Sequence, residues 1–560
     1  MVAFTAMALV LAWRAIDLQL SDREFLQEHG DARYLRTVES AAHRGMITDR
    51  NGEPLAISTP VSSVWAKPTE LLGQRRRWST LAKLLDMSQA HLETVLAPRR
   101  RREFIYLKRQ VSPDVAEAVE RAAIPGVELG AEYRRYYPSV EMAAHLVGFT
   151  DVDDRGQEGV ELAFDSTLRG APGLNRVIKD RLGRIVEHVE RIRAVQPGQD
   201  LALSIDRRIQ YIAYRELKRA VQANKAGAGL MVILDVDTGE VLALVNQPSY
   251  NPNNRGDLKS EFFRNRAVTD LFEPGSTIKP FTIIAGLESG LYTPTTPIDT
   301  APGTFLVGHH LVRDVHNYGA LDVTGVIEKS SNVGATKIAL SIDAEQLWSV
   351  FNQVGFGHAT EIEMPGEPLG RLPDFHGWRE IEQATLSFGY GVSVTALQLA
   401  RAYSVIASGG VLRPLSILRQ TQPSAGVRVM AEPTARAMNA MLERVVQYGT
   451  GKEAAVYGYR VAGKTGTVHK NTETGYAEDD YLSLFAGYFP ASAPRLVAVV
   501  MIDRPKGHEY YGGLVAAPVF ARVMLDSARI LNIPSDALPE EGESLKVALK
   551  PDASPGSAVH

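Results

Sequence analysis

One short stretch of the chain places a serine and a lysine at a spacing that could support nucleophilic catalysis. Residues 272–280 read Phe-Glu-Pro-Gly-Ser-Thr-Ile-Lys-Pro, with Ser276 three residues before Lys279. The Pro-Gly pair predicts a turn, and the apolar run after it predicts a helix that begins near Ser276, so both side chains share one helical face. A serine hydroxyl is a poor nucleophile until a base removes its proton. Lys279 can be that base when neutral, and a helix N-terminus and a dry pocket both lower a lysine pKa.

Two later motifs make this pair more specific. Ser330-Ser331-Asn332 is a Ser-x-Asn motif that begins 54 residues after Ser276, and the Lys-Thr-Gly-Thr motif at 464–467 begins 134 residues after Ser330. Ser-x-x-Lys alone occurs by chance about once in a chain of this length. In this order, the three motifs match the active-site signature of penicillin-binding proteins and class A β-lactamases. The spacing leaves room for a helical region followed by a return to a strand.

Composition excludes several other classes of function. The chain has 560 residues, enough for two or more domains. A net charge of −4 creates no overall field that would recruit nucleic acid. The chain contains no cysteine, which excludes disulfides, thiolate metal ligands and a cysteine nucleophile. Two arginine runs, 75–77 and 99–102, are interpreted as solvated helix ends or loops rather than as a site for a polyanion or a lipid headgroup.

Hydrophobic patterns indicate the elements that must position the three motifs. The predicted elements are a strand at 201–205, a helix capped by Asp206 and ending near Gln222, a buried hairpin at 230–245, helices over most of 277–450, strands at 482–489 and 496–502, and a helix at 515–531. Strands, then helices, then strands predict an α+β domain. Its sheet joins the two ends of the segment.

Residues 1–195 contain no group of residues with the types and spacing of a catalytic site. Residues 1–13 are apolar except for Thr5, but at 1.5 Å per residue they reach roughly 20 Å, short of the ~30 Å hydrocarbon core. We interpret them as the C-terminal part of a membrane anchor whose start lies upstream. Asp-Arg-Asn-Gly at 49–52 predicts a hairpin turn, and strands are predicted at 104–107 and 134–138. The predicted divisions are 1–20 (partial anchor and juxtamembrane segment), 21–195 (pedestal), 196–538 (catalytic domain) and 539–560 (disordered tail).

Several further stretches carry a resemblance to a known family. They are Arg44 to Gly52, Arg135-Tyr136-Tyr137-Pro138, Gly148 to Glu161, Ser387 to Gly391, and Tyr511 to Phe520. With the three motifs, they make the chain resemble class B penicillin-binding proteins, closest to the division-specific septal transpeptidases of the penicillin-binding protein 3 type. The resemblance implies an N-terminal pedestal followed by a serine transpeptidase domain of the penicillin-binding/β-lactamase fold, with a helical lobe and an antiparallel sheet sandwiched by helices. The chain departs from the family at its N-terminus, where a cytoplasmic tail and half of the anchor are missing.

The resemblance also implies the reaction. Ser276 attacks the penultimate carbonyl of a D-Ala–D-Ala stem peptide, D-Ala leaves, and the amine of a neighbouring stem peptide resolves the acyl-enzyme into a cross-link. Lys279 takes the serine proton, and Ser330 relays a proton to the leaving amine. The Asn332 amide holds Lys279 and the substrate backbone. Lys464 adds positive charge that favours neutral Lys279 and attracts the terminal carboxylate.

The third motif is implied to bind substrate. Thr465 and Thr467 lie on a strand edge where they can hydrogen-bond the carboxylate, and Gly466 keeps that edge open for an extended peptide. The backbone N–H groups of Ser276 and Thr467 are the predicted oxyanion hole, where one donor contributes about 3–4 kcal/mol. Two tyrosines are predicted to wall the substrate groove: Tyr390 and Tyr511.

Partners and location follow from the same resemblance. The expected partners are peptidoglycan stem peptides, lipid-linked or nascent glycan strands, β-lactam antibiotics as covalent inhibitors, a separate glycan polymerase and other membrane proteins of the division machinery. The expected location is the bacterial cytoplasmic (inner) membrane, with a single N-terminal anchor and a periplasmic catalytic domain. No cofactor and no metal is expected, since His309 and His310 are adjacent and form a poor chelate.

Four other functions stay open at this stage. Residues 458–465 match the Walker A phosphate loop letter for letter, but a helix must begin at its Lys-Thr, whereas a strand and a polar loop are predicted there. A β-lactamase would need a glutamate-activated water, and no Glu-x-x-Leu-Asn loop lies between the second and third motifs. A D-Ala–D-Ala carboxypeptidase usually lacks such a pedestal. A non-catalytic division scaffold would have lost catalytic residues that are intact here.

Overall fold

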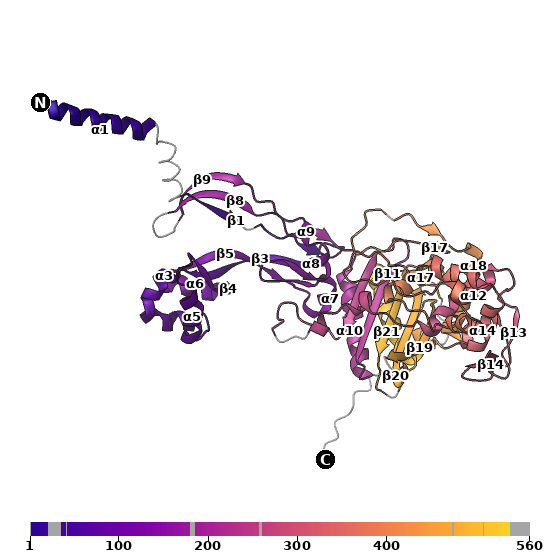
Figure 1. Ribbon diagram of the computed structural model, residues 1–560. Coiled ribbons are helices and arrows are strands. Elements are labelled where there is room, and N and C mark those ends of the chain that lie inside the picture. The colour runs from indigo at the N-terminus through magenta and orange to yellow at the C-terminus, as the bar shows by residue number, and fades with distance from the viewer. Residues whose placement is uncertain are drawn as a thin grey trace, which may run out of the picture.

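The computed structural model describes residues 2–20, 35–40, 42–179, 185–256, 260–422, 424–472, 475–507 and 509–537. Two β-rich arms extend from the C-terminal domain in the same direction (Figure 1). One arm is the sheet of β1 (Leu35–Ser40), β8 (Gly173–Lys179) and β9 (Ile185–Arg193). The other arm contains the long strands β3 (Pro54–Ala66) and β5 (Val127–Tyr136) and carries a helical unit at its outer end. Together the arms form the predicted pedestal.

A five-stranded antiparallel sheet, in the order β12-β11-β21-β20-β19, lies at the centre of the C-terminal domain. Its strands are β11 (Ala228–Asp235), β12 (Val241–Gln247), β19 (Ala462–Thr472), β20 (Gly475–Phe489) and β21 (Leu496–Asp503). The first two strands precede the helical region and the other three follow it. The sheet therefore joins the two ends of the segment, which confirms the predicted α+β class.

The sheet separates two hydrophobic cores. Along β11, Leu230 and Val232 belong to one core and Met231 and Ile233 to the other, as expected for a strand buried on both faces. One core contains residues of α10 (Arg207–Ala223) and α20 (Ala517–Leu531), and the other contains residues of α12 (Lys279–Glu288), α17 (Ala396–Ala407) and α18 (Glu432–Gln447). The motif-bearing elements are therefore fixed to a layer with helices on both faces.

Smaller elements complete this domain. They are α11 (Arg266–Thr269), α13 (Val323–Lys329), α14 (Asn332–Leu340), α15 (Ala344–Gln353), α16 (Glu380–Leu386), α19 (Gly512–Val515), and the strand pairs β13 (Pro297–Asp299) with β16 (Ala320–Asp322), β14 (Thr304–Val307) with β15 (His310–Arg313), and β17 (Val411–Leu412) with β18 (Val427–Arg428). Helices thus dominate the region between 277 and 450, as predicted. The three strand pairs there were not predicted.

The helical unit at the end of the second arm, which we call the head, comprises residues 67–127. It contains α3 (Pro68–Leu71), α4 (Trp78–Leu84), α5 (Gln89–Leu96), β4 (Ile105–Val111) and α6 (Pro113–Ala122). The head has its own hydrophobic core, which is closed against β3. Between the head and the C-terminal domain lie β2 (Ile47–Thr48), α7 (Ala144–Val147), β6 (Phe149–Thr150), β7 (Gly156–Glu158), α8 (Gly159–Ala163), α9 (Asp165–Leu168) and β10 (Leu201–Ala202).

Most of the strand and helix predictions agree with the structure. The hairpin at 49–52 joins β2 to β3, and Asp206 caps α10 by accepting a hydrogen bond from the Arg208 N–H. The strand predicted at 201–205 is wrong in length, because β10 ends at Ala202. Beyond it, the Leu203 N–H still donates to the Thr48 carbonyl at 2.9 Å, while the Ser204 N–H donates to the Ile417 carbonyl at 2.8 Å, so this segment bridges the pedestal and the C-terminal domain. The predicted domain boundaries stay predictions, and the predicted disordered tail, 539–560, lies outside the described residues.

A buried ion network explains several residues that carry the resemblance in the pedestal. Glu161 accepts from Arg44 at 2.7 Å and from Arg135 at 2.6 Å, and both members of the first pair are fully buried. Arg44 also pairs with Asp165 at 2.7 Å. Removal of one partner from such a network leaves an uncompensated buried charge, which typically costs about 3–5 kcal/mol. The network therefore fixes where the two arms begin.

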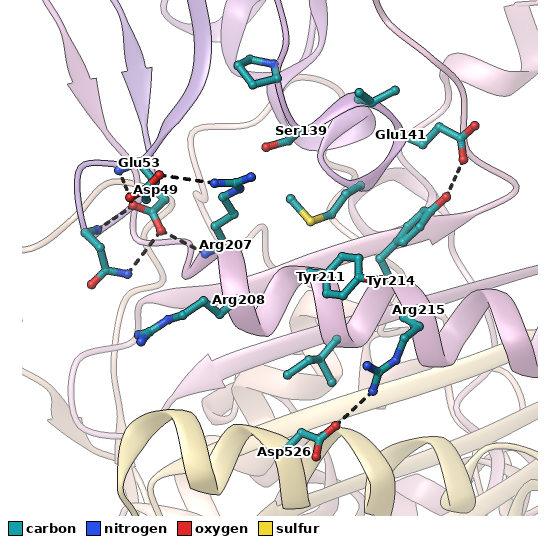
Figure 2. Close-up of a pocket in the computed structure, with 15 residues that line it drawn as sticks. Asp49, Glu53, Ser139, Glu141, Arg207, Arg208, Tyr211, Tyr214, Arg215 and Asp526 are labelled. Carbon is teal, nitrogen blue, oxygen red and sulfur yellow. Dashed lines mark hydrogen bonds and ion pairs between the residues drawn. The ribbon is translucent and has the colours of Figure 1, made fainter.

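The junction between the pedestal and the C-terminal domain is held by specific contacts. The Asp49 carboxylate accepts from the Arg207 N–H at 3.1 Å, at the start of α10, and the Glu141 carboxylate accepts from the Tyr214 hydroxyl at 2.5 Å. Both contacts are drawn in Figure 2. A hollow of about 1010 Å³ lies beside these contacts, and none of the residues lining it belongs to the three motifs. A single hydrophobic core also includes residues from both sides of the junction.

The apolar N-terminal stretch forms a helix, α1 (Val2–Leu20). Its side chains include the exposed Phe4 and Trp13, which are 80% and 74% accessible. Among the described residues, no helix has both the length and the apolar character needed to cross a membrane.

Candidate active site

The candidate nucleophile lies on a tight turn in front of α12. Ser276 is half-buried in a short 3-10 turn, Gly275–Ile278, and the α-helix itself begins at Lys279, three residues later than predicted. Gly275 has φ of +51°, and a Cβ there would lie 2.4 Å from a methyl group of Val468. Only glycine fits this close approach without strain. The turn is therefore pressed against β19, which carries the third motif.

Lys279 is fully buried and joins the first motif to the second. Its Nζ lies within hydrogen-bonding distance of the Asn332 Oδ1 at 2.7 Å, the Ser330 carbonyl at 2.5 Å and the Ser330 Oγ at 3.2 Å. Burial, and secondarily the charge of Lys464, lower the pKa of Lys279 well below its ordinary value, while Asp314 opposes the shift. A lysine of this kind is available as a base near neutral pH.

The third motif also reaches the Ser330 hydroxyl. Lys464 Nζ donates to the Ser330 Oγ at 3.0 Å, and burial lowers the Lys464 pKa to about 7. Lys464 to Thr467 lie on β19, the edge strand of the sheet, as predicted for Thr465, Gly466 and Thr467. A Cβ on Gly466 would lie 3.0 Å from the Thr277 methyl and 3.1 Å from the Pro274 carbonyl oxygen. The structure thus brings together Ser276, Lys279, Ser330, Asn332 and Lys464 from three separate parts of the chain.

Ser330 occupies a strained position between two helices. It follows α13, precedes α14 and has φ of +61°, a left-handed conformation that is uncommon for a residue with a side chain. Such strain persists only where the surroundings fix it, and it clusters at functional sites. Here the conformation presents both the hydroxyl and the carbonyl of Ser330 to Lys279.

Asp314 is a site residue that the sequence analysis missed. Its carboxylate accepts from the Ser331 Oγ at 2.5 Å, from the Asn332 N–H at 2.5 Å and from the Val333 N–H at 3.0 Å. It therefore holds the start of α14 and with it the second motif. The sequence offered no motif to mark it, since Asp314 stands alone as an acidic residue four positions after His310.

The two predicted tyrosines lie near the motif-bearing strand and turn. The Tyr390 ring meets the Tyr476 ring edge-on at 5.5 Å, and the Tyr476 hydroxyl donates to Glu273, three residues before the nucleophile. Tyr511 is 47% exposed and precedes Gly512, whose N–H donates to the Thr467 Oγ1 at 3.0 Å. Their role as groove walls stays a prediction. The sequence analysis missed the ring stack that continues from Tyr511: Tyr510 at 4.5 Å, and Tyr481 at 4.2 Å from Tyr510.

The site is unlike a nucleotide-binding loop. Lys464 and Thr465, which match the end of a Walker A motif, lie inside β19 rather than at the start of a helix. No helix N-terminus is therefore available there to cradle phosphate. In the part of the chain that the structure describes, no three histidine, aspartate or glutamate side chains are grouped as metal ligands.

Comparison with known proteins places this geometry in a family. The penicillin-binding protein transpeptidase domain matches residues 229–525, and the penicillin-binding protein dimerisation domain matches residues 39–203. The chain belongs to the penicillin-binding protein transpeptidase family. This agrees with the resemblance deduced from the motifs and with a pedestal that precedes the catalytic domain.

Individual relatives and solved structures within this family are similar to the chain over most of its length or over its C-terminal domain. The peptidoglycan D,D-transpeptidase FtsI of Escherichia coli K12 is 45% identical over 534 residues, which cover 94% of this chain and 90% of the relative. The transpeptidase domain of Burkholderia pseudomallei penicillin-binding protein 3 is 44% identical with a TM-score of 0.56, and covers 60% of this chain and 98% of that one. Penicillin-binding protein 3 of Mycobacterium tuberculosis, solved with aztreonam, is 27% identical with a TM-score of 0.69, and covers 89% of this chain and 98% of that one.

Proposed function

We propose that this protein is a peptidoglycan D,D-transpeptidase that cross-links stem peptides through an acyl-enzyme on Ser276, during septal wall synthesis, and that β-lactams acylate the same serine. One observation carries the proposal. The Ser330 hydroxyl lies within hydrogen-bonding distance of both buried lysines, 3.2 Å from Lys279 Nζ and 3.0 Å from Lys464 Nζ. The three motifs thus share one proton-transfer path beside the serine turn.

The acylation step follows from the protonation states that the site favours. Neutral Lys279 accepts the Ser276 proton as the hydroxyl attacks the penultimate carbonyl of D-Ala–D-Ala. The proton then passes through the Ser330 hydroxyl to the departing D-alanine nitrogen, and the C–N bond breaks. Negative charge that develops on the carbonyl oxygen is stabilised by the backbone N–H groups of Ser276 and Thr467. Lys464 balances the carboxylate of the substrate, with Thr465 and Thr467 as hydrogen-bond donors.

Resolution of the acyl-enzyme distinguishes a transpeptidase from its hydrolytic relatives. An amine from a second stem peptide attacks the ester, Lys279 removes an amine proton, and Ser276 leaves as its alcohol. Because β19 is the edge strand of the sheet, its outer backbone groups are available to bind an extended peptide beside the serine turn. Hydrolysis of the same ester by water would make the enzyme a carboxypeptidase, or a β-lactamase when the acyl group comes from an antibiotic.

The test uses a D-Ala–D-Ala donor peptide and a D-amino acid as acceptor. The wild-type protein should release D-alanine and form the exchanged peptide, whereas Ser276→Ala should form neither product. Hydrolysed donor without exchanged peptide, at saturating acceptor, would favour the carboxypeptidase reading. Loss of both products in Ser276→Ala but retention of penicillin acylation would place the nucleophile elsewhere.

The proposed location is the extracytoplasmic face of the bacterial inner membrane, with residues 1–20 as part of an anchor. The support is the exposed apolar surface of α1 and the absence of any motif residue from this segment. A separate glycan polymerase and other division proteins would meet the enzyme in that membrane. Removal of residues 1–20 should leave penicillin acylation within about two-fold of the full chain, or ~0.4 kcal/mol in barrier, and should abolish septal cross-linking in cells. Division supported by the unanchored form would contradict the anchor.

A further inference from the structure

The head carries a concentration of positive charge that the proposed reaction does not use. Residues 72–104 contain eight lysine or arginine and three aspartate or glutamate side chains, a net charge of +5 in a chain whose overall charge is −4. The two arginine runs supply seven of the eight, and all seven are exposed. Among the described residues, Arg75 alone of the seven forms an ion pair with a carboxylate, at 3.2 Å from Glu93.

The fold brings both runs next to one helix, α5. The first run lies in a 3-10 helix at 72–77 and contacts α5 through the Arg75–Glu93 pair. The second run follows the C-terminal end of α5 directly, in the loop that leads to β4. On sequence alone both runs are interpreted as solvated helix ends or loops, whereas in the structure both adjoin the same helix, α5.

Exposed aromatic rings adjoin the second run. Phe104 and Tyr106 are 52% and 43% accessible, and their ring centroids lie 5.8 Å apart. They line a hollow of about 720 Å³ together with Arg99, Arg102 and Glu103, so two guanidinium groups face one carboxylate there. Guanidinium groups beside half-exposed aromatic rings match the headgroup region of a bilayer, where phosphates meet arginines and amphipathic rings rest at the interface.

The head also lies at the end of the molecule from which the N-terminal helix departs. Leu35, the first residue of β1, pairs with Ile178 at the outer end of its arm and follows the last residue of α1 by 15 positions. Both arms extend away from the catalytic domain toward this end (Figure 1). An anchor that holds the outer end of one arm at a membrane would bring the head at the end of the other arm near the same surface.

We infer that the basic face of the head, formed by residues 75–77, 99–102, Phe104 and Tyr106, binds the headgroups of anionic phospholipids. The enzyme would then rest on the bilayer at two points, the anchor and the head. Two contacts restrict the tilt of the pedestal, and so the height at which the catalytic domain meets the wall. This inference rests on the proposed membrane attachment, but its test measures the contact of the head with the membrane separately from that of the anchor.

Because the chain contains no cysteine, a single introduced thiol can be labelled to measure how close the head comes to a membrane. Ala97→Cys, exposed between the two runs, would carry a fluorophore in the full chain, and Ala320→Cys in the catalytic domain would serve as the distant control. Each labelled protein is mixed with phosphatidylcholine vesicles, with or without phosphatidylglycerol, that contain a spin-labelled quenching lipid. The probe on the head should be quenched only with phosphatidylglycerol, and the control probe in neither case. In 1 M salt, where the Debye length is ~3 Å, quenching should fall by at least about half.

Charge variants complete the test. Changing residues 99–102 from arginine to glutamine should abolish quenching of the head probe. Four exposed arginines of the catalytic domain serve as the matched control when changed to glutamine: Arg379, Arg419, Arg436 and Arg529. Equal quenching in neutral vesicles, or in the variant of the second run, would overturn the inference. Penicillin acylation on the same samples tests the proposed reaction independently, and vesicle flotation of the variant tests the anchor.

Discussion

Asp314 provides a sharp test of how the second motif is held. Its carboxylate accepts three hydrogen bonds, from the Ser331 hydroxyl and from the N–H groups of Asn332 and Val333. Asp314→Asn keeps the size of the side chain but removes the charge. A hydrogen bond to a charged group is worth about 1 kcal/mol more than a neutral one, so the three together lose about 3 kcal/mol. At 1.36 kcal/mol per factor of ten, the upper limit is ~150-fold in acylation rate, and we expect about 10- to 100-fold after relaxation.

The assay is the second-order rate constant for acylation by a fluorescent penicillin, measured against pH. Asp322→Asn is the matched control, because Asp322 caps α13 through the Gly325 N–H but does not contact the second motif. It should slow acylation less than about three-fold. Acylation by Asp314→Asn within two-fold of the wild type would refute the positioning argument.

The pH profile separates this role from general damage. Burial and the charge of Lys464 lower the Lys279 pKa, and the negative charge of Asp314 partly offsets both. Loss of that negative charge destabilises protonated Lys279 and lowers its pKa further. The acid limb of the acylation profile should therefore move to lower pH in Asp314→Asn. Movement to higher pH would contradict the electrostatic account.

Three further predictions concern the base, the serine turn and a buried histidine. The acylation rate constant of Lys279→Arg should be at least about 100-fold below that of the wild type, nearly as low as that of Lys279→Ala, because a guanidinium group stays protonated. A stopped-flow rate for Lys279→Arg near that of the wild type would mean that Lys279 acts only as a fixed charge. Gly389→Ala should slow acylation and lower Tm, since its Cβ would lie 2.2 Å from the Gly275 carbonyl oxygen, whereas Gly391→Ala, with similar φ but 3.9 Å to the nearest atom, should cost less. Burial lowers the His145 pKa to about 4. Between pH 6.5 and 4 the unfolded chain therefore binds a proton at this histidine that the folded protein does not bind, and the free energy of unfolding should fall by up to ~3 kcal/mol. Denaturant titrations across this pH range should show that fall, and His145→Gln should show a smaller one.

The sequence predicted the motifs and the central sheet because both are local patterns. The Ser276–Lys279 pair and the continuous apolar strands can each be recognised from a few neighbouring residues. Asp314 does not, since its contact with the second motif exists only once β14 and β15 fold back against α14. The aromatic stack of Tyr481 and Tyr510 depends in the same way on pairing between distant segments.

Two local differences show where tertiary contacts override sequence patterns. The helix after the nucleophile begins at Lys279 rather than at Ser276, because the turn at Gly275 packs against Val468 and Gly389. The strand at Leu201 ends after two residues, where the chain begins to share its backbone hydrogen bonds between Thr48 of the pedestal and Ile417 of the C-terminal domain. The approach of both arginine runs to α5 is likewise a property of the folded head and not of either run.

The central claim is that Ser276 forms the acyl-enzyme, and one measurement tests it most directly. The protein is treated with penicillin, its intact mass is recorded, and the modified peptide is sequenced by mass spectrometry. The account predicts a single adduct on Ser276, and no adduct on Ser276→Ala. An adduct on any other residue, or one that survives in Ser276→Ala, would contradict it.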